Sequence, residues 1–439
     1  MTDALRRSLN SLEVENYRRF FAGQVISITG NWMQIVAETW LVVQLTGNGL
    51  SVGIAAGLQF LPILLFGAYG GVIADRYDKR RILFVTQSLM VLPALTLMAI
   101  SAAGVVTIWM VYALILLRGA VNCVDNPARQ AFVSEIVGPD RVVNAVSLNS
   151  VIVHTSRIAG PMLAGGLIAL VGVTPCFGAN ALSFVAMLVA LWRMDPSLLE
   201  PAPPADRGAG QARAALREVV ARPELLIPLA MMALVGTLAF NFQVILPLLA
   251  RFTWHGTATT YALLTSAMGV GSVVGALMSG ARGRVSPRLL VTATAVFGVA
   301  QLAAAVAPTL ALQMLALAPV GAASVTFAAG VNSSLQLQAS EGMRARVMAL
   351  YAVVFLGSTP IGSPITGAIA EAAGPRWSLV LGAAAALVAA AGARVAYERA
   401  GLGTPRHGGP AGPSMSPSAP FAGPPVVPEP TAERLSVAG

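Results

Sequence analysis

Long apolar stretches follow one another along almost the whole chain of 439 residues, and short polar breaks separate them. About 20 apolar residues in a helix are enough to cross the hydrocarbon core of a membrane. The pattern therefore predicts an all-α polytopic membrane protein with twelve transmembrane helices. Their predicted bounds are 20–45, 50–73, 82–102, 105–125, 142–171, 173–193, 224–250, 258–280, 289–307, 309–331, 347–370 and 376–396.

A polar, proline-containing segment, 194–223, separates the sixth stretch from the seventh. We interpret it as a cytoplasmic linker between two six-helix bundles, 20–193 and 224–396. Four polar residues of the first half recur 206 positions later in the second half: Asn126, Gln130, Ser134 and Glu135 recur as Asn332, Gln336, Ser340 and Glu341. Such a parallel repeat predicts two pseudo-symmetric bundles with a substrate cavity between them. The alternative is a chance likeness of two loops in an alanine-rich chain.

Basic residues predict the orientation of these helices. With 1–19 as a cytoplasmic N-terminal segment, only Arg251 and Arg376 fall in predicted outer loops, in keeping with the positive-inside rule. The even number of spans then places both termini in the cytoplasm. The first residues lack the apolar core and cleavage site of a signal peptide. Residues 397–439 are rich in proline and poor in large apolar side chains, which predicts a disordered cytoplasmic tail.

Composition excludes several classes of protein. Hydrophobic residues make up 56% of the chain and charged residues only 11%, too few charges for a soluble protein, so the lipid bilayer is the expected partner. The net charge of +9 is explained by the cytoplasmic loops, and no nucleic-acid partner is expected. The lone lysine, Lys79, is not part of a P-loop, so no nucleotide hydrolysis is expected. The histidines are scattered, which predicts no metal site.

One short motif matches an enzyme pattern without its structural context. Residues 49–53 fit the nucleophile elbow of serine hydrolases, but they lie in a turn between two predicted spans instead of between a strand and a helix. We therefore expect neither an enzyme nor a cofactor.

Polar residues recur every three or four positions along the first stretch: Gln24, Ser27, Asn31, Gln34 and Glu38. Such a stripe shares one helical face, which must look into the bundle or a water-filled cavity. Gln24, Asn31 and Gln34, together with Asn241 of the seventh stretch, are predicted to line the cavity. A carboxylate in such a place can take and release a proton, so Glu38 is the predicted proton site. The alternative is a purely structural Glu38.

Three further ionisable residues lie within predicted spans. Arg157 is at a depth close to that of Glu38, so we predict that these two residues are charge partners. His154, one turn away, is a predicted proton relay, with a structural hydrogen bond as the alternative. Arg118 is predicted to attract an anionic substrate or to modulate the proton site. Its alternative is an arginine that is satisfied by Asp125 and carbonyl groups.

The loop after the second stretch reads Gly71-Val72-Ile73-Ala74-Asp75-Arg76-Tyr77-Asp78-Lys79-Arg80-Arg81. It resembles the signature loop of the major facilitator superfamily, with Asp78 where that family usually has glycine. The resemblance implies that Gly71, Asp75, Arg76, Lys79, Arg80 and Arg81 form a conformational latch. Residues 20–24, 32–34, 40–42 and 126–132 resemble the bacterial branch with the enterobactin exporter and macrolide-efflux proteins, often called the transmembrane secretion effector group.

The resemblance implies a transporter of the bacterial plasma membrane that exports a small amphipathic molecule, such as a drug, secondary metabolite or siderophore. The expected driving force is the proton gradient, and a monomer is expected. One alternative is a uniporter or importer of the same fold without proton coupling at Glu38. Another is a non-transporting membrane scaffold or receptor, which would not require polar stripes through the bilayer.

Overall fold

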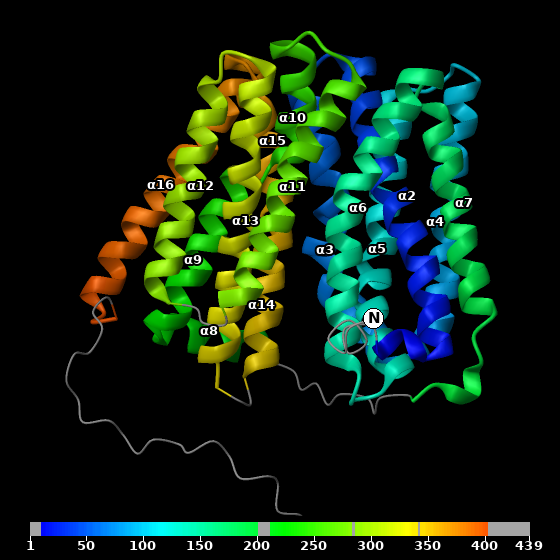
Figure 1. Ribbon diagram of the computed structural model, residues 1–439, viewed down its shortest axis with the longest axis horizontal. Coiled ribbons are helices and arrows are strands. Elements are labelled where there is room, and N and C mark those ends of the chain that lie inside the picture. Colours follow the sequence, from blue (N-terminus) through cyan, green and yellow to red (C-terminus); the bar gives the residue numbers. More distant parts are fainter. Residues whose placement is uncertain (1–9, 201–210, 283–285, 341–342, 403–439) are drawn as a thin grey trace, which may run out of the picture. The chain divides into compact units, whose positions relative to one another are not determined.

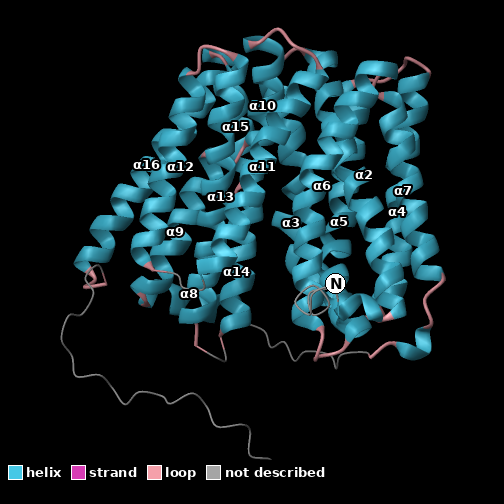
Figure 2. Cartoon of the chain, in the orientation of Figure 1, coloured by secondary structure: helices cyan, strands magenta, loops and turns pink. Residues whose placement is uncertain are grey.

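The computed structural model describes residues 10–200, 211–282, 286–340 and 343–402 of the chain. Most of this part is helical, as Figures 1 and 2 show. A short turn, η1 (Asn10–Glu13), precedes six long helices that correspond in order to the first six predicted spans. These are α2 (Glu15–Thr46), α3 (Gly49–Arg76), α4 (Lys79–Ala102), α5 (Ile108–Val137), α6 (Val142–Val171) and α7 (Thr174–Trp192).

The second half of the described chain contains two interrupted spans that the sequence pattern predicted as continuous. The seventh consists of α9 (Pro223–Leu238), α10 (Phe242–Leu248) and the π-helical turn η3 (Leu249–Thr253), and the eleventh of α14 (Arg344–Gly357) and α15 (Thr359–Ala373). The remaining spans are α11 (Ala258–Arg282), α12 (Pro287–Val306), α13 (Leu310–Gln338) and α16 (Pro375–Arg399).

Helices extend into segments that were predicted to be loops. Within the predicted linker lie η2 (Pro196–Leu198) and α8 (Gln211–Ala221), and α2 begins inside the predicted N-terminal segment. The last helix continues to Arg399, so the first residues of the predicted tail are helical. Residues 403–439, which make up the rest of that tail, lie outside the described residues.

Eleven segments of the described chain are long and apolar enough to cross a membrane. The helix α2 is not among them, because the polar residues along one of its faces lower its mean hydropathy. It is nevertheless 32 residues long and packs against α6 and α7. The prediction of an all-α polytopic membrane protein is therefore confirmed.

The same helix pairs pack together in both halves. The first span of each half contacts the sixth, the second contacts the fourth, and the third contacts both the fourth and the sixth. One side-chain contact also recurs, because Gln130 donates to Asn126 at 2.9 Å in α5 and Gln336 donates to Asn332 at 2.6 Å in α13. Glu341, the last residue of the predicted repeat, lies outside the described residues. The architecture is thus two six-helix bundles with equivalent packing.

Two helix pairs make the most extensive contacts between the bundles, α3 with α15 and α6 with α11. At the first pair, a Cβ atom on Gly367 would lie 2.4 Å from the carbonyl oxygen of Gly49. Only glycine permits this approach, which brings the two backbones into direct contact. The Gly49 N–H donates to Glu371, and the Thr259 hydroxyl donates to the Gly165 carbonyl at 3.3 Å. These contacts close the side of the molecule that was predicted to face outward.

The helix α8 packs against α9 and α14 of the second bundle, and one of its carboxylates bonds to that bundle. Glu218 accepts a hydrogen bond from the Ser340 hydroxyl at 2.8 Å and pairs with Arg222 at 3.2 Å. The Ser340 hydrogen bond is the main cause that lowers the pKa of Glu218 below its ordinary value.

A lowered folded-state pKa means that Glu218 stabilises the docked helix above its unfolded-state pKa and loses this effect as the pH falls through the folded-state pKa. We therefore expect Glu218→Gln to have a lower melting temperature than the unmodified protein at pH 7, and the difference to decrease as the pH falls below about 4.3, the ordinary pKa of glutamate. Thermal unfolding in detergent at several pH values measures this. Glu398→Gln, which alters an exposed carboxylate in α16, is the control. A difference that persists unchanged at low pH would contradict the assignment.

Candidate functional site

A cavity of about 360 Å³ lies between the two bundles, within the size range of small-molecule sites. The first bundle contributes residues of α2, α3, α5 and α6 to its wall. The second contributes residues of the break after α9, of α10 and α11, and of α13 to α15. Two of the four predicted lining residues, Asn31 and Asn241, are part of the wall. The other two, Gln24 and Gln34, are not, and this part of the prediction is corrected.

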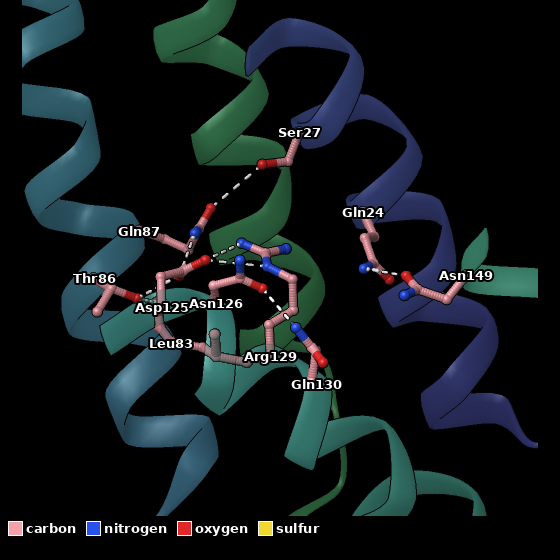
Figure 3. A network of polar contacts seen from close by, with 10 residues as sticks. All are labelled: Gln24, Ser27, Leu83, Thr86, Gln87, Asp125, Asn126, Arg129, Gln130 and Asn149. Atoms are coloured by element: carbon pink, nitrogen blue, oxygen red, sulfur yellow. Dashed lines mark hydrogen bonds and ion pairs between the residues drawn. The ribbon is translucent and has the colours of Figure 1, made fainter. Parts of the chain in front are cut away.

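Both glutamines are instead buried inside the first bundle. Gln24 of α2 donates to Asn149 of α6 at 2.7 Å, as Figure 3 shows. Gln34 donates to Glu38 at 2.6 Å and accepts a hydrogen bond from Asn180 of α7. The stripe on α2 spans an arc wide enough to face several neighbouring helices, so only some of its members reach the cavity.

Glu38 forms a buried ion pair with Arg118 of α5. Their atoms Oε2 and Nη2 are 2.6 Å apart, and both side chains are about 3% exposed. The predicted pairing of Glu38 with Arg157 is wrong, because α5 and α6 both adjoin α2 and it is α5 that presents its arginine to the carboxylate. An ion pair removed from water in this way is stable only when other hydrogen bonds complete it.

Neighbouring amides support this ion pair and connect it to the cavity. Gln34 donates to the second carboxylate oxygen of Glu38, and Arg118 also donates to Asn31 at 3.2 Å. Asn31 lines the cavity, so a single side chain separates the ion pair from the cavity. On the far side, Asn180 extends the hydrogen-bonded chain into α7. This arrangement can transmit a change of charge between the cavity and Glu38.

Arg157 of α6 lies in the cavity wall, with its guanidinium over the ring of Trp32. The guanidinium carbon is 5.1 Å from the ring centroid, a favourable cation–π distance. Close packing of α6 on α2 sets this geometry, because a Cβ atom on Gly160 would lie 2.5 Å from the Cβ atom of Trp32. Glycine at position 160 therefore brings the arginine and the indole together.

His154, the predicted proton relay, is half-buried in α6 and does not line the cavity. Its Nδ1 atom makes no hydrogen bond with the described residues. It is thus separate from the hydrogen-bonded chain around Glu38, and its role as a relay stays a prediction.

A second polar network lies in the first bundle, shown in Figure 3. Asp125 of α5 is buried and pairs with Arg129 at 2.8 Å. It also accepts hydrogen bonds from Thr86 at 2.6 Å and from Gln87 at 2.8 Å, both on α4. Sequence reasoning identified Asp125 but missed the two α4 residues. Their signal would have been a pair of polar positions within an otherwise apolar stretch.

The predicted latch residues lie at the end of α3 and the start of α4. Lys79 pairs with Glu135 of α5 at 2.9 Å, and both side chains are largely buried. Arg80 donates to the carbonyl group of Leu191 at the end of α7 at 2.8 Å. These two residues connect α4 to helices of the same bundle.

The other four latch residues are half-buried or exposed. Arg81 forms a weak, exposed pair with Asp78 at 4.0 Å, and Asp78 also accepts a hydrogen bond from the Arg81 N–H at the start of α4. Arg76 is exposed at the last position of α3, while Gly71 and Asp75 are half-buried in its final turns. A latching role for these residues stays a prediction.

The break between α9 and α10 forms part of the cavity wall. Asn241 donates to the carbonyl group of Thr237 at 2.7 Å, and Gln301 of α12 donates to that of Ala239 at 2.9 Å. A free carbonyl group inside a membrane costs several kcal/mol, so these amides stabilise the break. Ser363 of α15 in turn donates to Asn241 at 3.0 Å. Sequence reasoning identified Asn241 but missed Gln301.

Comparisons with known proteins agree with this geometry. The family described as transmembrane secretion effector matches residues 7–400. The chain is 26% identical over 359 residues to the enterobactin exporter of Citrobacter koseri. This alignment covers 80% of this chain and 85% of that protein. The chain is 32% identical over 176 residues to the staphyloferrin A transporter of Staphylococcus aureus, an alignment that covers 39% of this chain. That match spans 44% of the relative's length, and a match to an uncharacterized MFS-type transporter of Bacillus subtilis spans 40%.

Solved structures share the fold at low sequence identity. A bacterial homologue of the human lysosomal transporter Spinster, in an inward-facing and unoccupied conformation, has a TM-score of 0.70 at 16% identity. The match covers 87% of this chain and 97% of that structure. A bacterial homologue of the iron transporter ferroportin, in an inward-facing state, has a TM-score of 0.67 at 14% identity and covers 88% and 98%.

Proposed function

This chain belongs to the transmembrane secretion effector family, and from this premise we propose that it exports a small amphipathic molecule across the bacterial plasma membrane. The predicted resemblance and the predicted major facilitator fold are confirmed. The observation that carries the proposal is the cavity enclosed between two six-helix bundles. A cavity at such an interface is suited to alternating access, in which the bundles rock about a fixed binding site. One chain provides a complete cavity, so a monomer suffices.

The direction of the open side follows from the orientation of the chain. The positive-inside rule supports cytoplasmic termini, and the bundles contact each other closely where Gly49 meets Gly367. This end is then external, and the cavity opens toward the cytoplasm. An exporter loads its substrate in that state. The inward-facing conformations of the two related structures support the same interpretation.

Inward movement of protons is the proposed driving force, and Glu38 is the proposed proton site. In the state described, Arg118 neutralises the Glu38 carboxylate and also contacts Asn31 in the cavity wall. Protonation of Glu38 would break the ion pair and let Arg118 and Asn31 move, and this change in the cavity wall would favour release of the substrate. The substrate would in turn bind best while Glu38 is charged and paired with Arg118, since an unpaired buried charge is costly. Proton and substrate would thereby bind in alternation, as export driven by inward proton movement requires.

The direct test is the accumulation of candidate compounds in bacteria that lack their major efflux systems. We expect cells with the protein to accumulate less of at least one compound, and an uncoupler to remove this difference. The panel contains fluorescent dyes, antibiotics and siderophores, the last because one relative is an enterobactin exporter. Higher accumulation in cells with the protein would indicate uptake and overturn the proposed export. An effect that survives the uncoupler would overturn the proposed proton coupling.

Widening the contact between α3 and α15 is expected to stop transport. In Gly367→Leu the side chain would meet the backbone of Gly49 and Gly53, and backbone atoms cannot move aside as a flexible side chain can. The outer side then cannot close, and export should fall to the level of cells without the protein. Gly166→Leu is the matched control, because a Cβ atom there meets nothing within 4 Å. Export by Gly367→Leu at the control level would contradict a closed outer seam.

A further inference from the structure

The charge of the cavity wall is carried by one side chain. Among the described residues that line it, Arg157 is the one acidic or basic residue, and no carboxylate joins it. The nearby carboxylates are already neutralised inside the first bundle, Glu38 by Arg118 and Asp125 by Arg129. The wall therefore has a net positive charge, and the apolar helices around it focus the electric field into the cavity.

The donors of Arg157 are available to a ligand. Its side chain is exposed to the cavity, and among the described residues its guanidinium stacks on the ring of Trp32. Stacking uses the face of the guanidinium and leaves the N–H groups at its edge unused. An arginine presents these groups as a planar fork that fits a carboxylate, sulfonate or phosphate group. An anionic ligand would supply the partner that the protein does not.

The remaining wall is rich in aromatic rings, with amide groups between them. Six aromatic side chains from both bundles surround the cavity: Trp32, Phe60, Phe240, Phe242, Tyr261 and Phe355. Flat rings pack well on such surfaces. We propose that the cavity binds amphipathic anions that combine one acidic group, held by Arg157, with a flat aromatic body. This inference rests on the proposed function and specifies the class of its substrate.

Direct binding to the purified protein tests the inference without any need for transport. Three probes share one ring system and differ in charge: 1-naphthoate, 1-naphthalenemethanol and 1-naphthylmethylammonium. Isothermal titration calorimetry in detergent should give a dissociation constant for the anion at least about tenfold lower than for the cation, with the neutral alcohol between them. Equal binding of anion and cation, tighter binding of the cation, or no binding of any probe would overturn the proposal.

Variants identify the residue responsible. Arg157→Gln should remove the preference for the anion, and Arg157→Lys should keep part of it, because the charge stays while the planar fork is lost. Arg394→Gln, which removes an exposed arginine of α16, should bind all three probes as the unmodified protein does. An anion preference that survives Arg157→Gln would overturn the assignment of Arg157.

The binding result and the export result are independent. Anion-selective binding without export of any compound would mean that the proposed function fails and the cavity assignment stands. Export of cationic dyes together with preferential binding of 1-naphthylmethylammonium would mean that the proposed function stands and the assignment of an anion-binding cavity fails.

Discussion

Replacing Arg118 by methionine is expected to lower the free energy of unfolding by about 3–5 kcal/mol, the typical cost of leaving one charge of a buried pair without its partner. Glu38 and Arg118 are each about 3% exposed, so water cannot replace the lost contact. Methionine fills much of the same volume without a charge. Unfolding by titration with sodium dodecyl sulfate, followed by circular dichroism, measures the change.

A double variant separates the cost of the unpaired charge from the loss of packing. Arg118→Met combined with Glu38→Leu removes both charges, and such replacements of buried pairs are often neutral or stabilising. We expect it to recover most of the stability lost in the single variant. Arg394→Met provides a surface control, since exposed pairs contribute roughly 1 kcal/mol or less. A double variant as unstable as Arg118→Met would show that packing, and not charge, causes the loss.

Replacing Glu38 by glutamine is expected to abolish export against a concentration gradient, with cells accumulating as much compound as cells without the protein. Glutamine keeps an oxygen atom that can accept from Arg118, but it cannot take up a proton at neutral pH. The compound identified by the accumulation assay is used for this measurement. The amount of folded protein in the membrane is determined in parallel, because Arg118 loses its countercharge in this variant.

Counterflow in proteoliposomes distinguishes loss of coupling from loss of the site. With equal substrate on both sides and no proton gradient, Glu38→Gln should still exchange labelled for unlabelled substrate. Glu398→Gln, which alters an exposed carboxylate on α16, should retain both export and exchange. Export by Glu38→Gln that still responds to an uncoupler would exclude Glu38 as the proton site.

Much of the fold could be predicted from the sequence, because the hydrophobic pattern directly reflects the thickness of the membrane. The order of the spans and the repeat of Asn126 and Gln130 as Asn332 and Gln336 follow from local sequence alone. The break after α9 could not be predicted in this way. It depends on distant groups such as Gln301 of α12, which donates to the Ala239 carbonyl group that has no partner within α9.

The candidate site shows the same division. The sequence determined that Glu38, Arg118 and Arg157 are polar residues within apolar helices, and that the face of α2 that carries Glu38 cannot lie against lipid. It also determined their approximate depth, since each residue adds about 1.5 Å along a helix axis.

Only the tertiary structure decided which of these residues meet. Depth along an axis says nothing about the direction in which a helix turns its side chains or about the neighbour that it faces. The packing of α5 on α2 brings Arg118 into contact with Glu38, and the close approach of Gly160 to Trp32 turns Arg157 toward the cavity. Contacts between helices set these rotations, and the residues that make the contacts are far apart in the chain.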